Sequence, residues 1–286
     1  MSIRRIVVPL IGGNPDAKAL AVAFQLAKAQ GALVDGLYLR PDPADAVPYV
    51  GDAASAAIIE DLFEATKQAA DSAAALAKKS LEAAAAAAGV PIIAEMTAAR
   101  PPAARFLDKM GSVAQVMIAK SRLADLVVCA DVQANPPILA AFEAALIGAR
   151  RPVLIAPKAD GAKIGARVVI GWNGSTEAAH AVSSALPLLK NVASLTILAG
   201  DAEDKEPARA EELVGYLALH GIKAQVENFE TKSKSAGVAI IERAVALSAD
   251  LIVMGGYGHS RLREFILGGV TRHLLQNGNM AILLAH

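Results

Sequence analysis

The sequence is poor in cysteine and in aromatic residues, and it carries no excess of either charge. Its single cysteine, Cys129, excludes an intrachain disulfide and a multi-cysteine metal site. Lysine and arginine together number 28, as do aspartate and glutamate, so the basic excess of a protein that binds nucleic acid or an anionic membrane surface is missing. We therefore expect neither nucleic acid nor a membrane as a partner.

Long apolar runs are also missing. No stretch reaches the roughly 18 residues that a membrane span requires, apart from alanine-rich helical patterns that are too weakly hydrophobic. The residues after Met1 lead directly into a strand-like run without the apolar core of a signal peptide. These features predict a soluble cytoplasmic protein. Cys129 ends the apolar run that starts at Leu126, which favours a buried strand thiol over a reactive one.

What the chain does contain is an internal repeat. Three segments of the first half recur in the second half in the same order. The matching pairs are Ile6–Gly13 with Val168–Ser175, Ala124–Val128 with Ala249–Val253, and Pro152–Ala156 with Ala281–Ala285. The repeat predicts two related domains, residues 1–158 and 164–286, joined by a linker near 158–163.

Within each half, apolar β-branched runs alternate with longer amphipathic runs. In the second half the pattern predicts strands near 167–172, 194–199, 223–229, 250–254 and 280–285, with helices near 175–190, 205–220, 235–248 and 269–277. In the first half, a helix is predicted from Asp16 to Gln30, and an alanine-rich stretch from Ala53 to Ala88 predicts a long helix or a helix pair. The fold class is therefore α/β: two tandem, open, five-stranded parallel sheets with helices on both faces.

The most informative segment follows the fourth predicted strand of the second half. Gly255, Gly256 and Gly258 lie where ligands bind in open α/β sheets, and glycine lets the backbone approach a ligand closely. A second pair, Gly268 and Gly269, precedes a helical pattern whose free amides would face the same pocket. The segment thus predicts a phosphate site, and the alternative is a plain strand–loop–helix turn.

This segment resembles the ATP-binding signature of the universal stress protein family: Gly, two residues, Gly, nine residues, Gly, then Ser or Thr. Gly255, Gly258 and Gly268 have that spacing, Gly269 stands at the hydroxyl position, and Val270 and Thr271 match the start of the following helix. The strands of both halves also look like this family. The resemblance implies a Rossmann-like fold of the adenine nucleotide alpha-hydrolase type and ATP as ligand, with or without Mg²⁺.

The resemblance also implies further contacts in the second half. Asn173 takes the position of an acidic residue that contacts the nucleoside, and Gly171 takes a position usually held by proline. Gly200, at the end of the second strand, would lie at the adenine, with Met254 behind it. In the first half, Ile11 and the pair Pro136–Pro137 stand at the corresponding places, so that half is predicted to bind no nucleotide.

The leading hypothesis is therefore a homodimeric nucleotide-binding protein with a stress-response or signalling role. We assign no catalytic residue and no metal ligand, because the histidines, including His180 and His286, lack metal-ligand spacing and no nucleophile–base pair is evident. Catalysis would be at most slow ATP hydrolysis. The alternative is a dimeric interaction scaffold without a ligand, which Gly269 and Asn173 favour. In either case we expect the closing strands, Val153–Ile155 and Ile282–Leu284, to cover each other.

Overall fold

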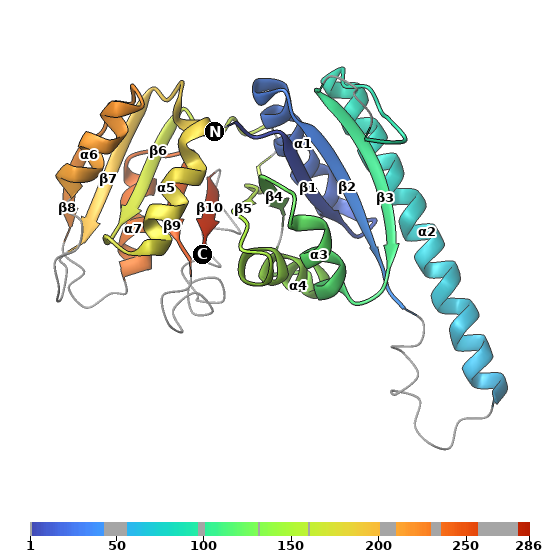
Figure 1. Ribbon diagram of the computed structural model, residues 1–286. Helices are drawn as coiled ribbons and strands as arrows, with labels where there is room; N and C mark the ends of the chain where they lie inside the picture. The colour runs from blue at the N-terminus through green and yellow to red at the C-terminus, as the bar shows by residue number, and fades with distance from the viewer. Residues whose placement is uncertain are drawn as a thin grey trace. The chain divides into compact units, whose positions relative to one another are not determined.

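The computed structural model of the chain describes residues 2–42, 56–96, 101–130, 132–159, 161–200, 210–229, 236–256 and 280–286. Contacts among them define two compact units. The N-terminal unit consists of Ile3–Val128 and Asn135–Ala149, and the C-terminal unit contains Cys129–Ala134 and Arg150–His286. Each unit has parallel strands with helices packed against them (Figure 1).

The N-terminal unit is built on parallel strands in the order β3-β2-β1-β4. These are β1 (Arg5–Leu10), β2 (Leu33–Arg40), β3 (Ala103–Met110) and β4 (Leu126–Cys129). Helices α1 (Asn14–Gln30) and α2 (Ala56–Ala88) pack on one face, and α3 (Val113–Ser121) and α4 (Pro136–Glu143), with the π-helical turn η2 (Ala144–Gly148), on the other. Because both faces are covered, β1 is buried from Ile6 to Leu10 and β4 over its whole length.

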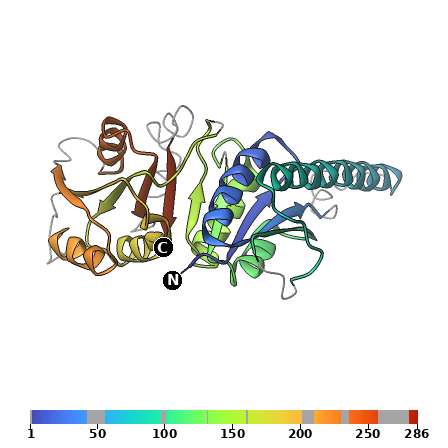
Figure 2. The same ribbon diagram turned by 90° about the horizontal axis from the view of Figure 1, so that it is seen from above.

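Helix α2 is one continuous helix of 33 residues, so the single-helix alternative holds. Its buried positions recur every three or four residues and are mostly alanine: Ala70, Ala74, Ala77, Leu81 and Ala85. Small side chains on this stripe allow the helix to approach the sheet closely. From residue 57 to residue 69, none of the described side chains is buried, and this part of α2 extends beyond the strands (Figure 1 and Figure 2).

The C-terminal unit has five parallel strands in the order β10-β9-β6-β7-β8. They are β6 (Arg167–Trp172), β7 (Ser194–Gly200), β8 (Gln225–Phe229), β9 (Leu251–Gly255) and β10 (Ala281–Ala285). Helices α5 (Thr176–Leu189) and α6 (Ala210–Leu219) lie on one face and α7 (Ala236–Ala246) on the other (Figure 2). The strand order β8-β7-β6-β9 repeats the order β3-β2-β1-β4 of the N-terminal unit.

Strand β5 (Val153–Ile155), which closes the first repeat, pairs antiparallel with β10. Leu154 lies opposite Leu283, and every residue of both strands is buried. This pairing confirms that the two closing strands cover each other, which removes an apolar sheet edge from solvent.

The predicted α/β fold class is confirmed, since the strands of each unit are mostly parallel and helices cover both faces of each sheet. The N-terminal unit holds four parallel strands and not the expected five, because β5, the last strand of its repeat, belongs to the C-terminal unit and pairs antiparallel with β10. Strands β6 to β10 begin and end within two residues of their predicted bounds, and α5 and α7 do likewise. The helix predicted at 269–277 lies outside the described residues. Cys129 is buried and unbonded, as predicted, and its burial raises the pKa of the thiol. Within the described ranges, no helix combines the length and the hydropathy that a membrane span requires.

The repeated Ala-Asp-Leu segment has the same physical role in both units. At the start of β4, Asp125 accepts hydrogen bonds from the backbone N–H groups of Arg4 and Arg5, at 2.8 and 2.9 Å. At the start of β9, Asp250 accepts them from Gly165, at 2.7 Å, and from Ala166 and Arg167. The carboxylate therefore fixes the start of the first strand of each repeat, at the amino edge of the sheet.

Candidate functional site

The predicted site residues that the structure describes come together at the carboxyl edge of the C-terminal sheet. Gly171 of β6 pairs with Met254 of β9 on one side and with Leu198 of β7 on the other. Asn173, Gly200 and Gly255 follow these positions at the ends of the same three neighbouring strands. The strand order changes direction between β6 and β9, which is where open α/β sheets bind ligands. The other predicted residues, Gly258, Gly268, Gly269, Val270 and Thr271, lie outside the described residues.

The turn between β6 and α5 is formed by small polar residues. The side-chain oxygen of Asn173 accepts a hydrogen bond from the backbone N–H of Ser175 at 3.1 Å, and Gly174 has φ of +72° between them. The Ser175 hydroxyl then accepts from the N–H of Ala178 at 3.1 Å and caps α5. Asn173 is exposed, so its NH₂ group and the second lone pair of its oxygen remain for a ligand.

Gly255 allows α5 to approach the end of β9. A Cβ atom on Gly255 would lie 2.6 Å from the backbone nitrogen of Ala178 and 2.8 Å from the carbonyl carbon of Glu177. Both atoms belong to helix backbone, so a larger residue would force α5 away. Gly255 therefore has a packing role. It lets the N-terminus of α5, which is the positive end of the helix dipole, lie against the end of β9.

Gly171 and Met254 face the opposite side of the sheet, toward α7. A Cβ on Gly171 would lie 2.9 Å from Cδ1 of Ile240, and Met254 packs against the cluster that contains Ile240 and Val169. These two residues form an apolar wall behind the edge. Trp172 is buried, with 8% of its surface exposed, in line with packing as its main role.

Two histidines that the sequence left without a role lie at this edge. The ring of His286 contacts the carbonyl oxygen of Gly256, and the ring of His180 contacts the main-chain oxygen of His286. These two histidines are 106 positions apart in the sequence, so their spacing does not indicate that they lie close together. The pairing of β9 with β10 brings them together. Among the described residues, no group of three or more His, Cys, Asp or Glu side chains could hold a metal ion.

The equivalent edge of the N-terminal unit is closed by the chain itself. The carboxylate of Asp16, in the first turn of α1, accepts hydrogen bonds from the backbone N–H groups of Ile11 at 3.0 Å, Gly12 at 2.8 Å and Gly13 at 3.3 Å. Asp16 is 1% exposed, and burial raises its pKa, which the three hydrogen bonds oppose. The amides that follow the first strand are thus already bound to an anionic group.

Helix α2 covers this turn. A Cβ on Gly12 would lie 2.3 Å from the carbonyl oxygen of Ala73, so the turn and the helix are in direct backbone contact. The Tyr38 hydroxyl donates to the carbonyl oxygen of Ala70 at 3.0 Å. Arg40, at the end of β2, donates to Asp71 of α2 and binds Asp108 of β3 in a bidentate pair. The two prolines, Pro136 and Pro137, form the first turn of α4, where N–H groups have no helical partner.

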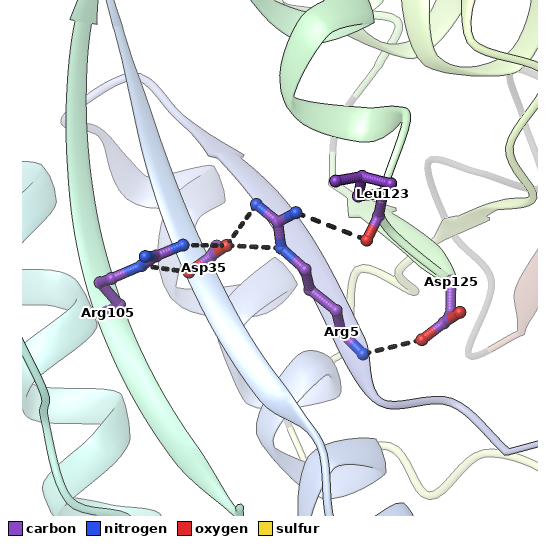
Figure 3. A network of polar contacts seen from close by, with 5 residues as sticks. All are labelled: Arg5, Asp35, Arg105, Leu123 and Asp125. Atoms are coloured by element: carbon purple, nitrogen blue, oxygen red, sulfur yellow. Dashed lines mark hydrogen bonds and ion pairs between the residues drawn. The ribbon is translucent and has the colours of Figure 1, made fainter. Parts of the chain in front are cut away.

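A buried ionic network lies at the other edge of the N-terminal unit (Figure 3). The Asp35 carboxylate is fully buried and binds the guanidinium groups of Arg5 on β1 and Arg105 on β3, with contacts of 2.8–2.9 Å. Arg5 also donates to the carbonyl oxygen of Leu123. All four contacts of the Asp35 carboxylate are made by arginines of the same sheet, so this network joins three strands and leaves no oxygen of Asp35 directed at a ligand.

The geometry defines a class of protein: doubly wound α/β units in which one carboxyl edge combines two glycines at a strand end, Gly255 and Gly256, with the N-terminus of a helix. Residues 166–286 match the model of the universal stress protein family. The chain therefore carries a universal stress protein domain in its second half, as the glycine spacing predicted. No curated protein matches the chain.

Solved structures extend the similarity of fold to the whole chain. A universal stress protein from Archaeoglobus fulgidus DSM 4304 is 16% identical, with a TM-score of 0.65 over 98% of this chain and 95% of that one. A functionally unknown protein from Pseudomonas aeruginosa PAO1 is 14% identical, with a TM-score of 0.51 over 99% and 92% of the two chains. A universal stress protein solved in complex with cAMP is 22% identical over 42% of this chain, with a TM-score of 0.29, and its ligand is a property of that protein.

Proposed function

We propose that the second half of the chain binds one adenine nucleotide, ATP, at the carboxyl edge of β6, β7 and β9. The observation that carries this proposal is the meeting of Asn173, Gly200 and Gly255 with the N-terminus of α5 at the point where the strand order changes. The chain continues from there into a segment with the glycine spacing of a nucleotide loop. A stress-response or signalling role would follow from the family of the domain.

The proposed activity is binding, with hydrolysis at most slow. The groups that the glycine loop would offer to phosphates are backbone amides, which stabilise charge but do not move a proton. Mg²⁺ would enter with the nucleotide, coordinated by its phosphates, since this metal commonly keeps few protein ligands.

Isothermal titration calorimetry with ATP and Mg²⁺ tests the proposal, and we expect one nucleotide per chain. Gly258→Val should abolish binding, because its side chain would occupy phosphate space, while the melting temperature stays near that of the wild-type protein. Gly215→Ala is the matched control, because a Cβ at Gly215 in α6 has no atom within 4 Å. Two nucleotides per chain would show that the first half is also a binding domain.

Gly269→Ser is the complementary gain-of-function test. The hydroxyl that this position carries in the family would add one hydrogen bond to a charged phosphate, so we expect about tenfold tighter binding. If the wild-type protein binds nothing and Gly269→Ser gains nothing, the nucleotide proposal is wrong.

The second candidate function is a homodimeric scaffold without a ligand. Gly269, which lacks the hydroxyl, and Asn173, which lacks the charge of the family's acid, favour it. Light scattering tests the dimer: we expect twice the chain mass of 29.4 kDa, with or without ATP. A dimer combined with an absence of nucleotide binding would select the scaffold.

A further inference from the structure

A chain of two hydrogen bonds connects α5 to the residue from which the glycine loop departs. Gly256 is buried, and its N–H donates to the carbonyl oxygen of Ala285 at 2.7 Å. Its carbonyl oxygen lies 3.1 Å from Nδ1 of His286. The main-chain oxygen of His286 lies 2.8 Å from Nδ1 of His180, on the second turn of α5.

The chemistry of the partners fixes the direction of both contacts. A main-chain oxygen accepts hydrogen bonds and does not donate them, so Nδ1 of each histidine must carry the hydrogen. His286 therefore donates to Gly256, and His180 donates to His286. The buried carbonyl of Gly256 has its partner in the His286 ring, and its loss would leave a polar group unsatisfied.

The backbone at Gly255 and Gly256, where the chain leaves β9, is ordered by contacts with other segments. Gly255 and Gly256 have no side chains to pack, and glycine loses more backbone freedom on ordering than any other residue. Gly255 is held by the close approach of α5, and Gly256 by hydrogen bonds to both its N–H group and its carbonyl oxygen. A loop entry that is already ordered reduces the entropy cost of binding.

We propose that His286 and His180 are positioning residues that set the direction of the backbone at Gly256, where the chain leaves β9, and thereby favour nucleotide binding. This inference rests on the proposed nucleotide binding. Neither histidine is given a contact with the ligand or a part in chemistry.

The test compares His286→Ala, His286→Asn and His180→Ala by calorimetry with ATP and Mg²⁺. We expect affinity to fall about five- to tenfold in His286→Ala, since one hydrogen bond to a buried carbonyl is lost. His286→Asn should retain most of the affinity, because the amide nitrogen of asparagine branches from the side chain at the same distance as Nδ1. His180→Ala should have a smaller effect, since it removes only the outer bond. His220→Ala is the control: this histidine directly follows α6, and its ring lies edge-on against Tyr216, away from Gly256 in the sequence and in its contacts.

Hydrogen exchange of the ligand-free proteins separates this inference from the proposed function. In His286→Ala, peptides covering 251–256 should exchange faster than in the wild-type protein, with the melting temperature within about 4 °C of the wild-type value.

If the wild-type protein binds no ATP, the nucleotide proposal fails, and exchange alone decides whether His286 holds the backbone at Gly256. Equal affinity and equal exchange in His286→Ala and wild type would overturn the inference, as would an equal loss of affinity in His286→Asn and His286→Ala. If His286→Ala does not fold, His180→Ala and His286→Asn decide by the same two measurements.

Discussion

The two sheets share a strand order and an amino-edge anchor, and they differ at the carboxyl edge. In the N-terminal unit this edge is occupied by an internal carboxylate, Asp16, and covered by α2. In the C-terminal unit the corresponding turn is made by the exposed Asn173 and by Ser175. The strand order and the aspartate anchors at Asp125 and Asp250 are properties of the scaffold, so both copies keep them. The carboxyl edge is where the copies have diverged.

One residue accounts for much of this difference. Because Ile6–Gly13 matches Val168–Ser175 position by position, Asp16 corresponds to Ala178. Gly12 and Gly174 also correspond, and both have positive φ, +77° and +72°. The turn thus has a similar backbone in both units, with its own carboxylate in one and an alanine in the other.

The largest effect on stability is expected where α2 meets the turn that follows β1 in the N-terminal unit. Gly12→Ala would place a Cβ 2.3 Å from the Ala73 carbonyl oxygen and force a side chain into the left-handed region. The two costs together predict a loss of about 2–5 kcal/mol in the free energy of unfolding, measured with urea. Gly89→Ala is the control, because Gly89 has φ of +67° but nothing within 4 Å of its Cβ position, so only about 1–2 kcal/mol should be lost. Equal losses would mean that α2 does not hold this turn.

The second effect concerns the carboxylate. Asp16→Ala removes the acceptor of three backbone N–H groups in a buried turn, and we expect the free energy of unfolding to fall by about 2–3 kcal/mol. Asn173→Ala, at the matching turn of the other unit, removes one exposed bond and should cost about 1 kcal/mol or less. A larger loss for Asn173→Ala would reverse the comparison between a filled and an accessible turn.

The scaffold could be predicted from sequence because its signals are local. Apolar strands, helical periodicity and the repeated Ala-Asp-Leu segment each lie within a few neighbouring residues, and β6 to β10 were located from them. Gly255 and Asn173 were assigned to one edge because parallel strands bring their carboxyl ends together.

The features that distinguish the two edges could not be predicted, because they depend on contacts between distant segments. Asp16 looks like any acidic residue in a first helical turn, and its burial follows from α2, which begins 40 residues later. The contact of Gly12 with Ala73 and that of Gly256 with His286 depend on how helices and strands pack. No spacing rule connects residues that meet only through a sheet register.

The third effect transfers the filled turn to the other unit. Ala178→Asp places a carboxylate where Asp16 lies in the first repeat, and it should repel nucleotide phosphates and occupy the turn amides. We expect at least tenfold weaker ATP binding by calorimetry, or about 1.4 kcal/mol. Ala179→Asp adds the same charge one residue further on, at an exposed position of α5, and should change affinity much less. Equal weakening in both variants would indicate a general effect of charge and not a filled turn.

The smallest expected effect is a pH dependence of stability that sets the buried Asp16 apart from ordinary surface carboxylates. Burial raises the pKa of Asp16 above its ordinary value of 3.8, more than the hydrogen bonds from Ile11, Gly12 and Gly13 lower it. Between the ordinary and the raised pKa, the folded protein retains a proton that the unfolded chain has lost. The stability that this group contributes is therefore fully present below about pH 3.8 and is lost as the pH rises through the raised value. Asp16→Asn removes this titration and leaves the other groups unchanged. Urea unfolding of both proteins across a pH series should then show the wild-type protein losing stability relative to Asp16→Asn as the pH rises from about 4, until the difference becomes constant. If the wild-type protein instead gains stability relative to Asp16→Asn over that range, the three hydrogen bonds to the carboxylate outweigh its burial. The turn would then favour a charged group.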